Sequence, residues 1–381
     1  MATRTVVICG VGYVGLHLVE TFSKRFRVIA FDVSEARCEL LRKQFAGSPR
    51  VVVTSKPDDM TGFDLCCISV PTLLKKGNDG IDASYVEKAV EIVGRYAAPN
   101  STVVMESSVT VGMTRDFLAP LRDKQVFVGF SPERVDPGRT VPSCDQIPKV
   151  ISGIDQASLD SVKSYYERVF DMVVPVATME TAEMSKLYEN CFRMINIAYA
   201  NEIADQCMKH GIDPYEMIRA CSTKPFGFMP FHPGLGVGGH CIPVNPWYLF
   251  TNNDLPLLRA ATEATAQRPI DKANLLIEEL HPESVLIVGV AFKPGQSVMS
   301  YAPQVSFANA LKEKGVRVAY YDPLVPQASC PDIPKLETTD FNEEYLDKNF
   351  TVIAVAMKQD KVDFVTLEML QKAHVYWYCH Y

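Results

Sequence analysis

The sequence predicts an α/β protein with two parallel-sheet domains joined by a long central helix and a helical connector. Short apolar runs alternate with amphipathic stretches at the start of the chain, and the same alternation returns over the last hundred or so residues. Between them, roughly 30 residues from about Thr178 contain neither Pro nor Gly, which is typical of a long helix. Strands alternating with helices indicate βαβ units and parallel sheets. We therefore expect domains at residues 1–177, 178–278 and 279–381.

The expected elements follow from these patterns. In the first domain we predict strands at 5–10, 27–32, 64–70, 101–107 and 126–133, with helices at 14–24 and 86–96. In the middle we predict a helix at 178–210 that ends at Gly211, and further helices from about Pro214 and Leu257. In the last domain we predict strands at 284–292, 316–322, 350–357 and 374–381, with helices at 305–314 and 364–372.

Composition excludes several classes of protein. The chain of 381 residues is 47% hydrophobic and 22% charged, with a formal net charge of -7. This acidic excess argues against a nucleic-acid partner, because such proteins neutralise phosphates with basic residues. No apolar run reaches the length of a membrane span, and the first residues lack the pattern of a signal peptide. We expect a cytoplasmic protein with no membrane partner.

The eleven cysteines do not form a disulfide or zinc pattern. Their number is odd, their spacing is irregular and no C-x-x-C occurs. We expect reduced, mostly buried thiols and no metal site.

The first helix is preceded by a dinucleotide-binding fingerprint. Gly10, Gly12 and Gly15 stand in G-x-G-x-x-G spacing after a strand and at the start of a helix, which is the context that this motif requires. The glycines permit a tight turn and close approach of the backbone to a pyrophosphate. Asp32 ends the second strand, where a carboxylate binds the ribose and repels the 2′-phosphate of NADP. We therefore predict a Rossmann-like domain with NAD as the cofactor, bound by Gly10, Gly12, Tyr13, Val14, Gly15, Asp32 and Arg37.

A second glycine-rich segment precedes a cysteine. FHPGLGVGGHCIP places four glycines within six residues ahead of Cys241, which suits a backbone close to a ligand and a thiol exposed enough to react. The alternative is a flexible loop with an incidental cysteine. We do not expect the adjacent His240 to be the base that activates Cys241, because neighbours in an extended segment point to opposite sides.

The central helix carries a polar stripe. Lys186, Asn190 and Arg193 stand at i, i+4 and i+7 and so share one face. Such a stripe is either a solvated face or a site for phosphate and oxyanions.

At these residues the sequence resembles the UDP-glucose/GDP-mannose dehydrogenase family. The resemblance runs in order through CGVGYVGLHL, ISVPT, ESSVTVGMT, GFSPERVDPG, AEMSKLYENCFRMINIAYANE, TKPFGFMPFHPGLGVGGHCIPVNPWYL, VLIVGVAFKPG and VAYYDP. The motifs SPERVDPG and GGHCIP are similar to those of the branch that acts on UDP-N-acetylhexosamines.

The resemblance implies a four-electron oxidation of a sugar C6 alcohol to a carboxylate, with two NAD reduced. Cys241 would form a thiohemiacetal and then a thioester. Lys186 and Asn190 would stabilise oxyanions, and Glu133 would be the general acid/base. Ser108 stands where many members have a water-holding Thr.

Further positions follow from the same resemblance. Pro71, Thr72 and Ser108 would contact the cofactor, and Lys293 would lie near the sugar nucleotide. Glu133, Lys186, Asn190, Arg193, Phe231, Gly238 and Lys293 make up the implied substrate site. The last domain would bind the nucleotide of the substrate, and the central helix would form a homodimer.

Two segments depart from the family pattern. Asn245 stands where the family has an Asp that assists thioester hydrolysis, and an amide cannot accept the water's proton. The family reads FKPDVDDTRESP where this chain reads FKPGQSVMSYAP, so that Ser300 replaces an Arg and Val298 an Asp. That Arg usually reaches the active site of a neighbouring subunit.

The sequence thus predicts an NAD-dependent nucleotide-sugar 6-dehydrogenase acting on a UDP-hexose or UDP-N-acetylhexosamine. One alternative is partial oxidation or epimerisation of a nucleotide sugar. The other is a degenerate, ligand-binding member with a regulatory role. A degenerate, ligand-binding protein is disfavoured by the presence of Cys241, Lys186, Asn190 and Glu133. The departures at Asn245 and Ser300 favour one of these two alternatives.

Overall fold

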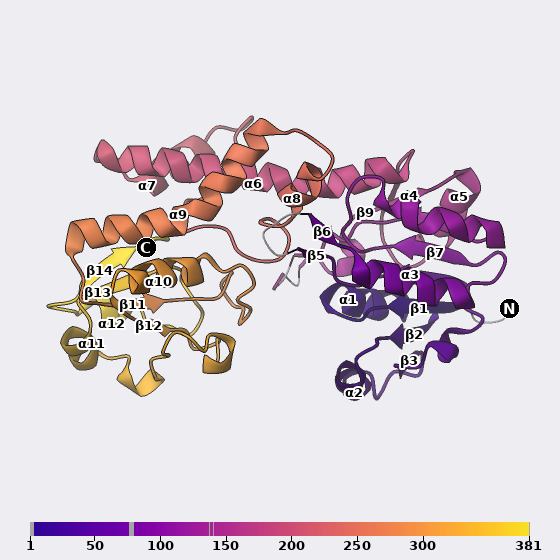
Figure 1. Ribbon diagram of the computed structural model, residues 1–381, viewed down its shortest axis with the longest axis horizontal. Coiled ribbons are helices and arrows are strands. Elements are labelled where there is room, and N and C mark those ends of the chain that lie inside the picture. Colours follow the sequence, from indigo (N-terminus) through magenta and orange to yellow (C-terminus); the bar gives the residue numbers. More distant parts are fainter. Residues whose placement is uncertain (1–3, 76–79, 137, 140, 381) are drawn as a thin grey trace. The chain divides into compact units, whose positions relative to one another are not determined.

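A computed structural model describes residues 4–75, 80–136, 138–139 and 141–380. The chain forms two compact units, whose elements are labelled in Figure 1. The N-terminal unit comprises residues 1–189 and 247–253, and the C-terminal unit comprises 190–246 and 254–381. The boundary falls within helix α6, Met179–Lys209, which confirms the predicted central helix.

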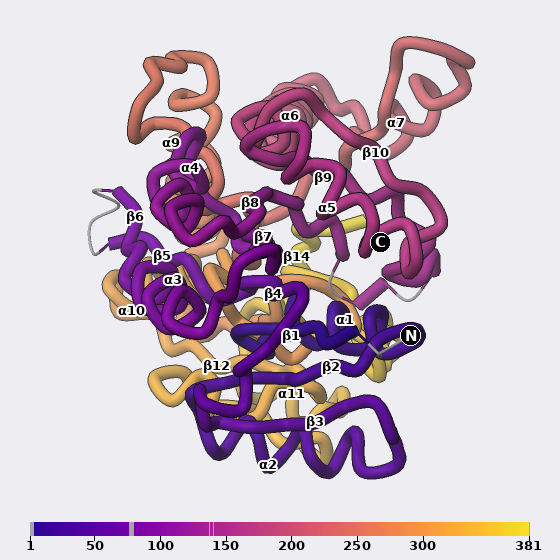
Figure 2. The backbone as a smooth tube through the Cα atoms, turned by 90° about the vertical axis from the view of Figure 1, so that its right-hand side faces the viewer, coloured from indigo at the N-terminus to yellow at the C-terminus, as the bar shows by residue number. Residues whose placement is uncertain are grey.

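The N-terminal unit is built on an eight-stranded sheet of order β10-β9-β8-β7-β4-β1-β2-β3. The strands are β1 (Thr5–Cys9), β2 (Arg27–Phe31), β3 (Val51–Thr54), β4 (Leu65–Ile68), β7 (Thr102–Met105), β8 (Phe127–Phe130), β9 (Lys149–Gly153) and β10 (Val173–Pro175). The five predicted strands are all present, whereas β3, β9 and β10 were not predicted. β1, β2 and β3 lie side by side in Figure 2, in parallel register.

One pair of strands in this sheet is not parallel. β8 and β9 pair in the antiparallel sense, with Gly129 opposite Gly153. Among the described residues between these two strands there is a short 3₁₀ helix but no crossover α-helix, and a parallel connection needs one. The predicted parallel sheet is therefore mixed at this point.

Helices cover both faces of the sheet. They are α1 (Tyr13–Phe22), α2 (Glu35–Gln44), α3 (Ser84–Tyr96), α4 (Met113–Leu118) and α5 (Gln156–Tyr166). Alternate residues of β1 enter different core clusters, since Val7 packs in one and Ile8 in the other. Strands buried on both faces read as continuous apolar runs, which explains the TVVIC pattern. A short hairpin, β5 (Leu73–Leu74) and β6 (Ile81–Asp82), and helix α8 (Asn245–Phe250) complete the elements around this unit.

The C-terminal unit contains a four-stranded parallel sheet of order β12-β11-β13-β14. Its strands are β11 (Ser284–Val288), β12 (Arg317–Tyr321), β13 (Val352–Val355) and β14 (His374–Trp377), all at predicted positions. Its helices are α7 (Pro214–Ser222), α9 (Pro256–Leu280), α10 (Pro303–Glu313), α11 (Glu343–Asn349) and α12 (Val365–Glu368). α9 packs on α10, as Figure 1 shows. α11 was not predicted, and α12 is much shorter than the predicted 364–372.

Within the described residues, no helix is both long enough and apolar enough to cross a membrane.

Candidate active site

The glycine loop after β1 has the shape that a dinucleotide needs. Gly10 has a φ of +88°, and a Cβ there would lie 2.7 Å from Val70. A Cβ on Gly15 would lie 2.1 Å from the Gly10 carbonyl oxygen, so this glycine lets α1 pack closely on the turn. A Cβ on Gly12 would meet nothing within 4 Å, and no side chain caps the helix there. The first N–H groups of α1 are therefore available to a pyrophosphate.

Asp32 is held in place at the end of β2. Its Oδ2 accepts a hydrogen bond from the Val11 N–H at 2.9 Å, and its Oδ1 accepts one from the Ser34 N–H at 2.9 Å. Arg37 donates from Nε to the Val11 carbonyl oxygen at 2.7 Å. The glycine loop and the carboxylate are thus tied to each other. Tyr13 is exposed and Val14 half-buried at the start of α1. These residues fit NAD.

The segment after β4 is braced by hydrogen bonds. Thr72 donates from Oγ1 to the Ser108 carbonyl oxygen at 2.7 Å. The hydroxyl of Tyr248, on α8, lies 2.8 Å from Thr72 Oγ1. Pro71 next to them is exposed. The three predicted cofactor contacts Pro71, Thr72 and Ser108 therefore lie together in the N-terminal unit.

Glu133 and Lys186 are also in the N-terminal unit, and both are buried, at 8% and 9% exposure. Glu133 follows β8, and Lys186 lies on α6. Glu133 Oε1 accepts hydrogen bonds from the N–H groups of Arg134 at 2.7 Å and Val135 at 2.6 Å. Lys186 is buried and therefore does not lie on a solvated face of α6, which was one of the two interpretations of the polar stripe.

Asn190 and Asn245 contact each other in the C-terminal unit. Asn190 donates from Nδ2 to Asn245 Oδ1 at 2.5 Å, and the two residues are 6% and 2% exposed. Asn245 begins α8, and its N–H donates to the Cys241 carbonyl oxygen at 2.9 Å. The hydrogen bond between Asn190 and Asn245 therefore joins α6 to the loop that carries Cys241. Arg193, the third residue of the predicted stripe, is exposed.

Cys241 is exposed, whereas the ten other cysteines are buried or half-buried. All eleven cysteines are free in the structure. Burial raises the pKa of the Cys9 thiol to about 12 and that of Cys191 to about 12, so these thiols stay protonated and unreactive. Its exposure makes Cys241 the thiol best placed to react.

The glycines before Cys241 make close packing contacts that the sequence did not predict. A Cβ on Gly236 would lie 2.7 Å from Pro303, and one on Gly238 would lie 2.8 Å from Phe292. Gly239 has a φ of +89°, and its N–H donates to the Ser300 carbonyl oxygen at 2.7 Å. The glycines thus let the cysteine loop pack against the segment at 292–303.

That segment also engages His240. Ser300 Oγ lies 2.8 Å from His240 Nε2, and the Tyr301 ring meets the imidazole edge-on. Ser300, which stands in place of the family Arg, therefore contacts the cysteine loop of its own chain. The prediction that His240 is not the base for Cys241 stays a prediction. Lys293, in the same segment, is half-buried.

Phe231 opens the glycine-rich loop. Its ring packs edge-on against Phe192 of α6, with centroids 5.9 Å apart. Farther along, Gly234 is fixed on both sides, because its N–H donates to Asn201 Oδ1 at 2.9 Å and its carbonyl accepts from Arg268 Nε at 2.8 Å. Helices α6 and α9 thereby anchor the loop.

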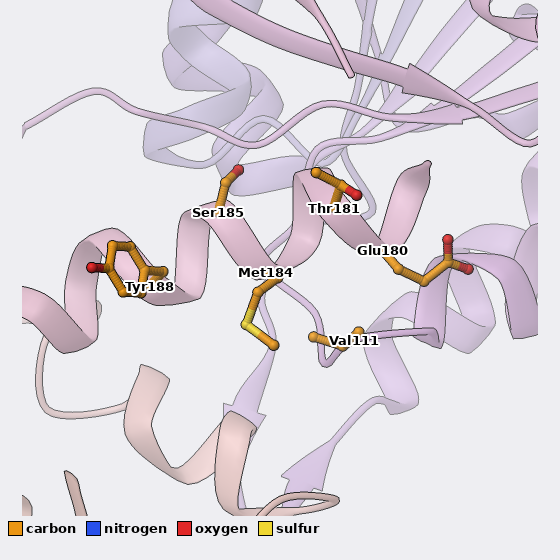
Figure 3. A pocket seen from close by; sticks show the side chains of 6 residues that line it. All are labelled: Val111, Glu180, Thr181, Met184, Ser185 and Tyr188. Carbon is orange, nitrogen blue, oxygen red and sulfur yellow. The ribbon is translucent and has the colours of Figure 1, made fainter. Parts of the chain in front are cut away.

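A surface hollow of about 500 Å³ lies along α6 (Figure 3). It is lined by Val111, Glu180, Thr181, Met184, Ser185 and Tyr188. None of the residues predicted for catalysis or binding lines it.

Sequence reasoning missed the ionic partner of Glu133. Lys149, at the start of β9, and Glu106, directly after β7, are buried at 4% and 1% exposure. Their signal was a charged residue adjoining a short apolar run, in STVVME and PKVISG. Charged residues are almost never fully buried unless they are paired.

Comparison with known proteins places the whole chain. Residues 4–170, 180–265 and 286–376 match the NAD binding, central and UDP binding domains of the UDP-glucose/GDP-mannose dehydrogenase family. Protein CapL of Staphylococcus aureus is 33% identical over 84% of this chain and 82% of its own. UDP-N-acetyl-D-glucosamine 6-dehydrogenase of Pseudomonas aeruginosa is 30% identical over 92% of this chain and 82% of its own.

A solved structure of UDP-D-ManNAc dehydrogenase from Pyrococcus horikoshii superposes with a TM-score of 0.89 at 25% identity, covering 99% of this chain and 96% of its own. The matched NAD binding domain contains the glycine loop and Asp32 described above. The chain is therefore an NAD-dependent oxidoreductase, and it belongs to the UDP-glucose/GDP-mannose dehydrogenase family.

Proposed function

We propose that this enzyme oxidises the C6 alcohol of a UDP-N-acetylhexosamine to the carboxylate. Relatives that match most of the chain are named for UDP-N-acetyl-D-mannosamine and UDP-N-acetyl-D-glucosamine. The observation that carries the proposal is Cys241, an exposed thiol held next to the buried Asn190–Asn245 pair. A two-step oxidation at one carbon needs a nucleophile that can hold the aldehyde stage.

The residues divide the chemical work. When bound, NAD would supply the acceptor for the hydride that leaves C6 in each of the two oxidation steps. Glu133 removes the proton of the C6 hydroxyl, and the thiolate of Cys241 adds to the resulting aldehyde carbon. The thiohemiacetal that forms on Cys241 then loses a second hydride and becomes a thioester. Water then releases the carboxylate and restores the thiol. Two hydrides and three protons leave and one water oxygen enters, which balances the oxidation of an alcohol to a carboxylate.

Oxyanions form on the substrate at each stage, and buried donors suit their stabilisation. Lys186 supplies an ammonium, and Asn190 supplies an amide N–H whose orientation is fixed by Asn245. Because Asn245 Oδ1 accepts from Asn190, the remaining polar group of Asn245 is its NH₂, which donates but does not take a proton. Asn245 and Ser108 would orient the hydrolytic water without acting as its base.

We assign the nucleotide sugar to Arg193, Phe231, Gly238 and Lys293, together with Glu133, Lys186 and Asn190. We likewise propose three domains, at residues 1–177, 178–278 and 279–381, of which the last binds the UDP group. We also place the enzyme in the cytoplasm, where its eleven free thiols stay reduced.

We propose a homodimer formed through α6. Met184, Tyr188, Phe192 and Tyr199 are 38%, 66%, 37% and 63% exposed, and their spacing places them on one side of the helix. The apolar hollow of Figure 3 continues this stripe at Met184 and Tyr188. Exposed apolar patches of this kind mark protein interfaces.

The direct test is incubation with NAD and a panel of UDP-hexoses and UDP-N-acetylhexosamines, followed by mass spectrometry of the product. The proposal predicts a uronic acid from an N-acetylhexosamine. A changed sugar of unchanged mass would support an epimerase instead, and tight NAD binding without turnover would support a regulatory protein. Asn245 and Ser300 are the observations that keep these two alternatives in the test.

A further inference from the structure

The N-terminal unit contains a buried ionic cluster that the mechanism above uses only in part. Lys149 lies on β9, Glu106 follows β7 and Glu133 follows β8, with side chains that are 5%, 0% and 9% exposed. Removing two carboxylates and an ammonium from water costs free energy, and apolar residues of similar volume would often be at least as stable. Stability alone therefore does not explain the cluster.

Glu106 is fully paired. Its Oε2 accepts from Lys149 Nζ at 2.6 Å, and its Oε1 accepts from the Tyr166 hydroxyl at 2.5 Å. Burial raises the pKa of Glu106, and the Lys149 charge opposes that rise. Burial alone would lower the pKa of Lys149, but the carboxylates of Glu106 and Glu133 hold it above its usual value. Lys149 is therefore a cation at neutral pH.

Within the described part of the chain, Glu133 accepts hydrogen bonds at only one of its oxygens. Oε1 is engaged by the two backbone N–H groups that follow it. Among the described residues, Oε2 is buried with no hydrogen-bond partner, and it lies 3.8 Å from Lys149 Nζ. Lys149 also donates to the Pro132 carbonyl oxygen at 3.1 Å, so its ammonium is fixed beside Glu133. The geometry leaves Oε2 as the oxygen able to take a proton.

We infer that Lys149 is a positioning residue that keeps Glu133 ionised and ready to accept the C6 hydroxyl proton at Oε2, while Glu106 limits this effect by sharing the same ammonium. The inference rests on the proposed role of Glu133 as general base. An opposite charge within about 4–6 Å favours the ionised form of a carboxylate, and a like charge disfavours it. Lys149 thus lies between the two carboxylates and contacts both.

Two other titratable groups face Glu133. Burial raises the pKa of Cys144, on the 3₁₀ helix Cys144–Gln146, to about 11, and Glu133 contributes to the rise. Burial, with Asp136 and Glu133, also raises the pKa of Tyr13 on α1. Both groups are therefore neutral in the working pH range.

Arg134 follows Glu133 in the chain, but its guanidinium is engaged by Glu189 at 2.6 Å. Among the described residues of the packed strands, the charged groups beside Glu133 are Lys149 and Glu106, and Asp136 lies three residues along the same segment.

The test compares how kcat/KM depends on pH in the full-length wild type, Lys149→Met and Glu106→Gln. The acidic limb reports the protonation of the base. In Lys149→Met the limb should move to higher pH by about 1 unit or more, because the carboxylate loses its cation. In Glu106→Gln it should move to lower pH, because Lys149 then faces Glu133 alone. Lys149→Arg should restore most of the wild-type profile. A merely structural role lowers activity without moving the limb in opposite directions.

Infrared titration of the resting enzyme gives a second readout that needs no turnover. The protonated carboxyl band of Glu133 is identified by its loss in Glu133→Gln, and its midpoint should shift as the acidic limb does. Equal midpoints in the wild type, Lys149→Met and Glu106→Gln would overturn the inference, as would shifts of the same sign. Full activity of Glu133→Gln would instead overturn the proposed base, and the infrared midpoints would still decide whether Lys149 controls this carboxyl. If Lys149→Met does not fold, Glu106→Gln alone tests the sign.

Discussion

The side-chain amide of Asn190 donates a hydrogen bond of 2.5 Å to Asn245 Oδ1, and both residues are buried. This bond fixes two amides next to the loop that carries Cys241, and it leaves Asn245 without a group that can accept a proton from water. An aspartate in place of Asn245 could accept the same bond from Asn190, because a carboxylate oxygen replaces the amide oxygen. The hydrogen bond from Asn190 could therefore form with either Asn or Asp at position 245, whereas only Asp could act as a general base in hydrolysis.

The first prediction concerns thioester hydrolysis. We expect a burst of up to about two NADH per active site, followed by slow turnover, because general-base assistance is worth about 10²–10⁴-fold. Asn245→Asp should reduce the burst relative to the steady rate. Rapid-quench measurement of NADH, with intact-protein mass spectrometry of the Cys241 adduct, checks both points. Linear NADH release from the first turnover with no adduct would show that Glu133 already serves as the base.

The second prediction concerns the nucleophile. Cys241→Ser should block the second oxidation and leave binding of NAD and nucleotide sugar largely intact, because a serine alkoxide is hard to form at neutral pH and leaves poorly. The measurement is uronic acid production alongside calorimetric binding of both ligands. Cys221→Ser is a matched control, since that thiol is half-buried on α7. Wild-type carboxylate production by Cys241→Ser would exclude the covalent mechanism.

The third prediction concerns cofactor choice. The wild type should prefer NAD to NADP, because the fixed carboxylate of Asp32 repels a 2′-phosphate. Asp32→Asn keeps an oxygen for the backbone N–H groups but loses the charge, so kcat/KM with NAD should fall by about 10- to 100-fold and the preference should narrow. Thermal unfolding of the variant controls for damage to the loop. Equal efficiency with both cofactors in the wild type would contradict the assignment.

The fourth prediction concerns the proposed dimer. Tyr188→Glu should raise the dimer dissociation constant by at least about 30-fold, the equivalent of about 2 kcal/mol for an interface aromatic, and symmetry repeats the loss on the second copy. Val365→Glu, at a residue 54% exposed on α12, is the control. Sedimentation equilibrium measures both. A monomeric wild type, or an unchanged constant for Tyr188→Glu, would rule out α6 as the interface.

The fifth prediction concerns the anchor of the cysteine loop. Arg268 pairs with Asp205 through two bonds of 2.6 and 3.0 Å while holding the Gly234 carbonyl. Arg268→Met should destabilise the protein by about 2 kcal/mol, less than the loss for a fully buried pair, because the Asp205 side chain is 32% exposed.

The loss of stability in Arg268→Met should depend on pH, and the sign of this dependence follows from the pKa of Asp205. Burial tends to raise the pKa of Asp205, but hydrogen bonds from Arg268 and Lys272 outweigh it and the pKa is lowered. A lowered pKa stabilises the folded protein above the ordinary Asp value of about 3.9, and this contribution is lost as the pH falls through the folded value. Denaturant unfolding should therefore show the gap between wild type and Arg268→Met narrowing below about pH 4. A gap that is constant with pH would show that the ion pair is not its source.

The sequence was most informative where local chemistry determines local structure. The TVVIC strand, the glycine turn at Gly10 and Gly15, and the long α6 follow from apolar pattern, backbone freedom and the absence of helix breakers. Of the strands that were missed, β3 and β9 include polar residues and β10 has only three residues. Lys149 begins β9, and its charge is tolerated only because Glu106 is brought to it from another strand. Such pairing depends on the fold, and a single sequence does not show it.

The same limit applied to the site. The fingerprint and Cys241 were predicted as motifs, but the reason for the glycines at Gly236 and Gly238 was not, since Pro303 and Phe292 lie far along the chain. The Asn190–Asn245 bond joins residues 55 positions apart. Asn190 was predicted from helix spacing and Asn245 from a departure in a motif. Only the folded chain shows that they contact each other.

The stoichiometry of NADH per sugar tests the central claim most directly. A limiting amount of a UDP-N-acetylhexosamine that the enzyme turns over is converted to completion with excess NAD, and NADH and product are quantified together. The account predicts two NADH and one uronic acid for each sugar consumed, because C6 passes through the aldehyde on Cys241 without release. One NADH with an aldehyde product, or none with an altered sugar, would contradict it.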